Sequence, residues 1–209
     1  MVNRVMENNE VLVAGNIETP LEYDHQLYGE TFYKFYIAVP RLSGYVDRLP
    51  VTISERLLGD IDMDVGNEVI IEGQLRSYNK QIEGRNRLVL TVFTRDIREK
   101  TEEMKNPNHI FLNGFLCKPP IYRVTPFKRE ISDLLMAVNR SYNKSDYIPV
   151  IAWGRNARFC ETLKVGDQLM LWGRIQSRIY QKRLSDDQVE ERTAYEVSIT
   201  KMEVVEKDK

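Results

Sequence analysis

The chain repeats itself once, with an offset of about 99 residues. Shifting the sequence by 99 places superimposes identical residues over a long stretch, and a shift of 100 does so further along. The matched positions include Gly15 with Gly114, Arg41 with Arg140, Asp47 with Asp146, Gly73 with Gly173 and Ser77 with Ser177. About 100 residues can bury a core unaided, so this period indicates a duplicated domain and not a solenoid of short repeats.

The repeat also sets the domain boundaries. We expect one domain at residues 1–105 and a second at residues 106–209. The polar segment KTEEMKNPN, residues 100–108, suits a solvated linker because it contains a proline and lacks an apolar pattern.

Each copy has the pattern of five short strands. Runs rich in Val, Ile, Phe and Tyr alternate with turns rich in Gly, Asn, Asp and Pro. Between the third and fourth strands of the second copy, NARFCETL (residues 156–163) has the spacing of a short helix. The pattern predicts an all-β chain of two tandem OB-folds, five-stranded Greek-key barrels each with a short helix after strand three. Gly15 and Gly114, in the middle of the first strands, favour the sharp bend that such a barrel needs.

Composition argues against several classes of protein. The N-terminus lacks an apolar signal region, and no apolar run approaches the roughly 20 residues of a membrane span, so we expect a cytoplasmic protein without a membrane partner. Cys117 and Cys160 lie far apart without metal-ligand spacing, which predicts no disulfide framework and no metal site. His25 and His109 are the two histidines, and neither stands in a catalytic pattern. We therefore expect no catalytic residue, no cofactor and no enzymatic activity.

Aromatic rings alternate with cations along residues 136–183. The four rings in polar, basic surroundings are Tyr142, Tyr147, Trp153 and Tyr180. The cations between and after them are Arg140, Lys144, Arg155, Arg158, Arg174, Arg178, Lys182 and Arg183. Rings on one sheet face can stack on unpaired bases, at roughly 1–3 kcal/mol per base, while Arg and Lys contact phosphates.

Packing offers a second explanation for each of these residues taken singly. A ring in a strand is as often a core residue as a binding platform, and a cation is often only solvated. The four rings together favour stacking, whereas Trp172 extends an apolar strand and is expected in the core.

Over residues 108–205 the second copy resembles a bacterial single-stranded DNA-binding protein. The resemblance is carried in order by NHIFLNGFL, LLMAVNRSY, DYIPVIAWGRNA, LKVGDQLMLWGRIQSRIY and AYEVSI. It implies that Tyr142, Tyr147, Trp153 and Tyr180 are the family's base-stacking positions. It further implies a member with two OB-folds per chain that acts in DNA replication, recombination and repair at the nucleoid.

The resemblance also bears on partners. The family assembles four OB-folds, so we expect a homodimer of this two-domain chain, with replication proteins as possible further partners. The sequence ends at EVVEKDK, soon after the last expected strand, so recruitment through the family's acidic tail is not expected.

The two copies differ in charge and in rings. Residues 106–209 hold 17 lysines and arginines against 13 acidic residues, a net charge of +4, whereas residues 1–105 hold 13 against 18, a net charge of −5. The four ring positions correspond in the first copy to Ser43, Arg48, Ser54 and Lys80. Tyr45 and Tyr78 lie two residues away from such positions, and strand parity alone does not decide whether they substitute. We expect the first copy to serve mainly in assembly.

Two functions are consistent with these features. The first is sequence-independent, non-catalytic binding of single-stranded DNA by the second copy. The alternative is an OB-fold protein-interaction module of a primosome or a mobile-element replication complex, in which DNA binding is weak.

Overall fold

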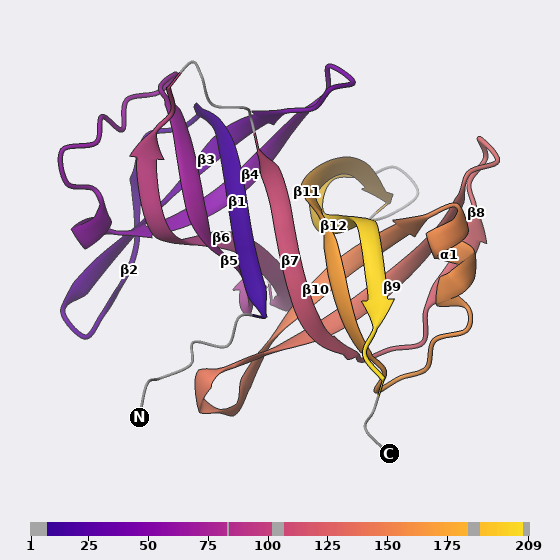
Figure 1. Cartoon of the computed structure of the whole chain (residues 1–209). Helices are drawn as coiled ribbons and strands as arrows, with labels where there is room; N and C mark the ends of the chain where they lie inside the picture. The colour runs from indigo at the N-terminus through magenta and orange to yellow at the C-terminus, as the bar shows by residue number, and fades with distance from the viewer. Residues whose placement is uncertain (1–7, 83, 102–106, 184–188, 207–209) are drawn as a thin grey trace.

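The structure, a computed structural model, describes residues 8–82, 84–101, 107–183 and 189–206. Two β-barrels lie side by side, one from each half of the sequence (Figure 1). The first contains β1 (Asn9–Ile17), β2 (Glu22–Leu27), β3 (Glu30–Pro40), β4 (Val46–Ser54), η1 (Glu55–Leu57), β5 (Glu68–Ile82) and β6 (Arg85–Glu99). The second contains β7 (Asn108–Leu116), β8 (Ile121–Val124), β9 (Glu130–Arg140), η2 (Ser141–Asn143), β10 (Lys144–Trp153), α1 (Arg155–Cys160), β11 (Gln168–Arg183) and β12 (Val189–Val204).

Hydrogen bonds close each barrel in the same way. The strand order is β2-β3-β4-β6-β5-β1 in the first half and β8-β9-β10-β12-β11-β7 in the second. The pairings β1–β3 and β7–β9 close the two barrels, and β4–β6 and β10–β12 are parallel. The prediction of two tandem OB-folds is confirmed.

Alternating side chains fill the two barrels. In β9, for example, Leu134, Met136 and Val138 are buried while the residues between them are partly exposed. This period of two is what a strand with one face on a core requires. The buried residues of both barrels form one continuous hydrophobic cluster.

Two details differ from the sequence-based expectations. Each barrel has a sixth short strand, β2 or β8, which pairs only with the strand that follows it, at the edge of the sheet. These segments were missed because little of them is buried, so they lack the apolar run of a strand. The helix after the third predicted strand is an α-helix in the second copy but a single 3-10 turn in the first. The expected domain boundary, between residues 105 and 106, lies outside the described residues.

Glycine is required where the first strand of each barrel bends. A Cβ atom on Gly15 would lie 2.6 Å from the carbonyl oxygen of Ala38, and one on Gly114 would lie 2.6 Å from that of Ala137. Just beyond Gly15, the residues Asn16 and Ile17 pair with β3, while Gly15 itself pairs with β5. The first strand thus passes from one side of the barrel to the other at a point with no room for a side chain.

The two barrels share an antiparallel seam. β1 pairs with β7 in a register that places Asn9 opposite Leu112 and Val13 opposite Asn108. The seam joins the barrels into one 12-stranded sheet with the two copies on either side of it. Figure 1 shows β1 and β7 side by side in the centre of the molecule.

Two hairpin arms cross this seam in opposite directions. The first arm, residues 40–48 at the tip of β3 and β4, contacts β11 of the second barrel, and the second arm, residues 139–147 at the tip of β9 and β10, contacts β5 of the first. In Figure 1 the second arm extends beneath the first barrel.

A buried aspartate anchors each arm. Asp47 accepts a hydrogen bond from the backbone N–H of Ser177 at 2.7 Å, and Asp146 accepts one from that of Ser77 at 2.7 Å. Both carboxylates are fully buried, and each is paired with an arginine of its own arm, Arg41 or Arg140. Three of the repeated pairs, Arg41 with Arg140, Asp47 with Asp146 and Ser77 with Ser177, therefore tie one copy to the other.

We predict that the Asp146→Ala substitution destabilises the whole chain by about 3–5 kcal/mol, because it leaves the guanidinium of Arg76 and the N–H of Ser77 without their buried partner. Urea denaturation followed by circular dichroism measures the change. The matched control is Asp133→Ala, which removes an exposed ion pair with Arg123 and should cost less than about 1 kcal/mol. Equal losses for the two variants would contradict this role of Asp146.

Candidate nucleic-acid interface

A groove runs along the open face of the second barrel. We call it groove A; it has a volume of about 760 Å³ and a mixed polar and apolar lining. Its lining includes Arg41, Ser43, Tyr45, Arg123, Thr125, Arg129, Ile131, Ile151, Trp153, Arg174, Gln176, Ser177, Arg178, Ile179, Glu196 and Ser198. Five of these residues are arginines and one is a glutamate, so an anion is the ligand that the charges favour.

Trp153 supplies the ring of groove A from the last position of β10. Its side chain is 37% exposed, and its indole N–H donates a hydrogen bond to the hydroxyl of Ser198 at 3.1 Å. The bond fixes the orientation of the indole ring while leaving part of the side chain open to solvent. A fixed, exposed indole is a suitable surface for stacking a planar ligand.

Arg174 brings a partly buried positive charge to the floor of the groove. Burial lowers the pKa of its guanidinium from the ordinary value, and the nearby charge of Arg41 acts in the same direction. Among the described residues, its one hydrogen bond to a side chain is a long one, 3.4 Å, to the amide oxygen of Gln176. The charge of Asp47 opposes this shift, but no carboxylate of the described residues is bonded to Arg174, which leaves its guanidinium poised to bind an anion.

The first arm completes groove A from the other copy. Arg41 lies over the ring of Tyr45, with its guanidinium carbon 4.5 Å from the ring centre. Arg41 also donates to the Asp47 carboxylate at 2.6 Å and to the carbonyl oxygen of Ser177 at 3.2 Å. The bond to Asp47 raises the pKa of Arg41, so this guanidinium stays charged. The contacts hold the ring of Tyr45 at the edge of a groove that belongs mainly to the second barrel.

The structure divides the predicted site residues among four places. Trp153, Arg174 and Arg178 line groove A. The second arm carries Arg140, Tyr142, Lys144 and Tyr147, beside the first barrel. The helix α1 carries Arg155 and Arg158, and Arg158 is paired with Glu130 at 3.1 Å. The outer part of β11 carries Tyr180, Lys182 and Arg183.

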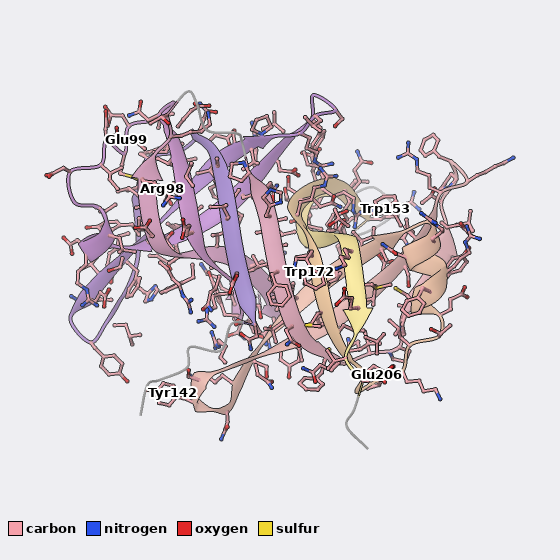
Figure 2. All side chains as sticks on the ribbon, viewed as in Figure 1. Arg98, Glu99, Tyr142, Trp153, Trp172 and Glu206 are labelled. Carbon is pink, nitrogen blue, oxygen red and sulfur yellow. The ribbon has the colours of Figure 1, made fainter. Side chains whose placement is uncertain are left out.

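The four predicted rings therefore do not share one face. Figure 2 shows Trp153 on the second barrel and Tyr142 far from it, at the tip of the second arm. Tyr142 is 94% exposed, and its φ of 63° is typical of a tight turn. Tyr147 lies on the same arm, where its backbone N–H donates to the hydroxyl of Ser77 at 2.7 Å. Tyr180 lies further along β11, with the guanidinium carbon of Arg178 at 5.7 Å from its ring centre.

Among the aromatic and basic residues of groove A, Arg41, Arg123 and Arg129 were not expected from the sequence, and Tyr45 was left undecided. Two of them come from the first copy, and strand patterns along the chain contain no signal that a hairpin crosses to another domain. The sequence did contain one signal of this contact. The pair of Arg41 and Asp47 recurs at Arg140 and Asp146, and packing within a single strand does not explain why such a pair is repeated.

Trp172 also lies elsewhere than predicted. It is only partly buried and contacts Phe111, with ring centres 5.1 Å apart, while the ammonium group of Lys201 lies 4.6 Å from its ring. It was expected in the core because its neighbours are apolar, but at this position β11 presents the ring to the outer face of the sheet beside the seam.

The first copy has a groove of its own, related to groove A by the repeat. We call it groove B; it has a volume of about 600 Å³ and is lined by Asp24, His25, Thr52, Arg76, Ser77, Tyr78, Asn79, Lys80, Thr91, Phe93 and Arg140. Arg140 reaches it from the second arm, just as Arg41 reaches groove A from the first. Each groove is thus bordered by an arm of the opposite copy.

Other kinds of site find little support in the described part of the chain. No group of three or more His, Cys, Asp or Glu residues is arranged there to hold a metal ion. None of the helices within the described ranges is long and apolar enough to cross a membrane.

The described residues thus form two OB-folds, each with a sheet groove lined with rings and cations. Residues 107–205 match the model of the single-strand binding protein family. The second OB-fold therefore belongs to the single-strand binding protein family.

Known proteins extend the similarity to the whole chain. The single-stranded DNA-binding protein of Thermus thermophilus is 28% identical over 135 residues, which cover 56% of this chain and 51% of that protein. The chain spans about half the length of the curated relatives it matches. The crystal structure of the wild-type single-stranded DNA-binding protein from Thermus aquaticus has a TM-score of 0.74 and 20% identity, covering 96% of this chain and 94% of that one. At 20% identity this similarity shows only that the two proteins share a fold.

A third similarity is one of sequence. The N-terminal domain of the PriB protein from Thermoanaerobacter tencongensis, whose structure is described as dimeric, is 52% identical over 46% of this chain and 100% of that domain. Its TM-score of 0.42 supports no comparison of structure.

Proposed function

We propose that the protein binds single-stranded DNA, without catalysis and largely independently of sequence, with groove A as its principal site. The observation that carries this proposal is the fixed, partly exposed ring of Trp153 in a groove with five arginines. An unpaired base would stack on the indole, and its phosphates would meet Arg174 and Arg129. Stacking and phosphate contacts do not read the edges of bases, which is why such binding tolerates any sequence.

The strand would continue from groove A along the remaining predicted residues. Tyr180, with Lys182 and Arg183 beyond it, extends the path along β11. Arg155 and Arg158 on α1, and Arg140, Tyr142, Lys144 and Tyr147 on the second arm, would contact parts of the strand outside the groove. We assign the protein to DNA replication, recombination and repair, in the cytoplasm at the nucleoid. We further propose that the first copy serves assembly through the β1–β7 seam.

We predict that Trp153→Ala weakens binding of an oligo-dT strand by about 5- to 150-fold, the value of one stacked base. Fluorescence anisotropy of a labelled oligomer measures the affinity. The control is Trp172→Ala, because Trp172 lies outside groove A and should change binding little. Unchanged binding in Trp153→Ala would refute groove A as the site, and it would favour the protein-interaction module as the function.

We predict that Tyr45→Ala also weakens oligo-dT binding several-fold, although Tyr45 belongs to the first copy, because its ring borders groove A. Tyr28→Ala is the matched control, since Tyr28 is a fully exposed tyrosine of the same copy that does not line groove A. The same anisotropy titration serves for both variants. Equal effects would mean that the first arm does not take part in binding.

We predict that two chains associate to give four OB-folds. Sedimentation equilibrium at micromolar concentration should then give a mass near twice the 24.5 kDa of the chain. A single species at the mass of one chain would contradict the homodimer without affecting the assignment of groove A.

A further inference from the structure

An exposed aromatic ring stands at each outer end of the molecule. Tyr28 lies in the turn between β2 and β3, at the outer end of the first barrel, and Phe127 lies in the turn between β8 and β9, at the outer end of the second. Figure 1 shows β2 and β8 on opposite sides of the seam. Tyr28 is 99% exposed and Phe127 is 87% exposed, so neither ring belongs to a core. Neither of them lines groove A or groove B.

The turn itself does not explain the ring of Tyr28. Leu27 pairs with Glu30, so the turn has two residues, Tyr28 and Gly29, and both have a positive φ, 50° and 79°. Such a turn prefers Asn, Asp or Gly at its first position, because a larger side chain is strained at positive φ. An aromatic residue that neither packs nor suits its turn is a candidate for contact with another molecule.

Negative charge surrounds Tyr28. Tyr28, Glu30, Glu55 and Arg56 line one small depression. Arg56 is paired with Glu30, whereas Glu55 is exposed and has no ion pair among the described residues. The loop after η1 adds three further exposed carboxylates: Asp60, Asp62 and Asp64. We call the surface formed by Tyr28, Glu55 and these three aspartates the acidic end.

Positive charge surrounds Phe127 at the other end of the molecule. Lys128 and Arg129 follow it in the same turn, and both are exposed. Arg155 begins α1 beside this turn, because the backbone N–H of the preceding residue donates to the carbonyl oxygen of Glu130 at 2.9 Å. None of these three cations forms an ion pair with another described residue. We call the surface formed by Phe127, Lys128, Arg129 and Arg155 the basic end.

The two ends occupy equivalent places in the repeat, yet their charges are opposite. The corresponding residues are Tyr28 with Phe127, Glu30 with Arg129 and, further along, Asp64 with Lys164. The exposed ring is therefore kept in both copies, while carboxylates of the first copy are replaced by cations in the second. The exposed carboxylate of Glu161 is an exception within the second copy. Two surfaces that each present a ring among unpaired charges of opposite sign are complementary to one another.

We infer that the basic end of one molecule binds the acidic end of another copy of this chain, head to tail. The cations of one end meet the carboxylates of the other around the two rings, whose apolar surface is then removed from water. A nucleic-acid strand would fit the basic end alone, whereas a second copy accounts for both surfaces.

This contact differs from the homodimer proposed above. It joins unlike surfaces on opposite sides of the molecule, so each bound copy leaves one free end, and association continues as an open row instead of closing as a pair. The inference goes beyond the proposed function, and it does not rest on groove A.

The experiment measures the average mass of the full chain, without DNA, by sedimentation equilibrium at increasing protein concentration. It compares about 0.01 M salt with about 1 M salt, where the Debye length is about 30 Å and about 3 Å. We expect the mass to keep rising with concentration at low salt and to reach a plateau at high salt. A homodimer alone would give a plateau at both.

Charge-reversal variants test each end separately. Glu55→Lys with Asp60→Lys should abolish the rise at low salt, and so should Lys128→Glu with Arg155→Glu. The matched control is Glu191→Lys with Glu206→Lys, which changes the net charge as much as the first variant at exposed positions outside both ends. The control should retain the rise.

A mixture of the two charge-reversal variants tests whether the joined surfaces are unlike. Each variant alone lacks one end, but the mixture contains an intact end of each kind and should recover the rise. Tyr28→Asn provides a variant without a change of charge. Asn suits the turn, so this variant should melt no lower than the unmodified chain while its association weakens several-fold.

Several results would overturn the inference: no rise at low salt, a rise that either charge-reversal variant retains, a mixture that does not recover, or a control that loses the rise. Loss of oligo-dT binding in Lys128→Glu with Arg155→Glu, in a chain whose mass does not rise, would make the basic end a nucleic-acid contact instead. Circular dichroism melts show whether each variant is folded. The assignment of groove A is tested separately by Trp153→Ala and stands or falls without these results.

Discussion

The pairing of β1 with β7 is the contact on which the rest of the structure depends. It aligns the two barrels edge to edge, and only in this alignment do the two arms reach the opposite copies. The buried carboxylates of Asp47 and Asp146 then fix the arms, because a buried charge is stable only with its hydrogen-bond donors in place. Backbone pairing of β1 with β7 sets the relative position of the two barrels, and the two aspartates fix the position of each arm on the opposite barrel.

The grooves follow from this geometry. Neither groove is built by one OB-fold alone, since Arg41 and Tyr45 border groove A and Arg140 borders groove B. The residues that secure the domain contact and those that line groove A are partly the same. Arg41 bonds Asp47 and the backbone of the second barrel while its guanidinium stacks on a ring at the groove. If groove A binds as we propose, a change in the domain contact should therefore also change ligand affinity.

The sequence was sufficient to predict the fold but only part of the lining of groove A. The repeat and the strand pattern led to two tandem OB-folds, because alternation of buried and exposed residues is a local property of each strand. Trp153, Arg174 and Arg178 could be assigned to a common region for the same reason. Tyr45 could not, since its partners belong to another domain. Trp172 was misplaced because apolar neighbours in the sequence do not determine which side of a strand faces the core.

Comparing the two copies position by position was likewise insufficient to predict which residues line groove B. It showed that the first copy lacks rings at four positions, yet Phe93 and Tyr78 lie in groove B on a neighbouring strand or two residues away. A groove is lined by several strands, so a side chain of a given kind can be supplied from more than one backbone position. Parallel pairing of β4 with β6 makes such a replacement possible.

The seam between β1 and β7 has a further consequence, because both strands belong to one polypeptide. Two separate chains paired in this way would come apart on dilution, whereas two segments of one chain meet at an effective concentration set by the short connection between them. Pairing of the copies therefore does not depend on how much protein is present. Because the two copies lie in one chain, each can also change independently. A substitution alters only one of the two paired barrels, whereas in a pair of identical chains it would alter both. Grooves A and B, whose linings differ, are an example of such independent change.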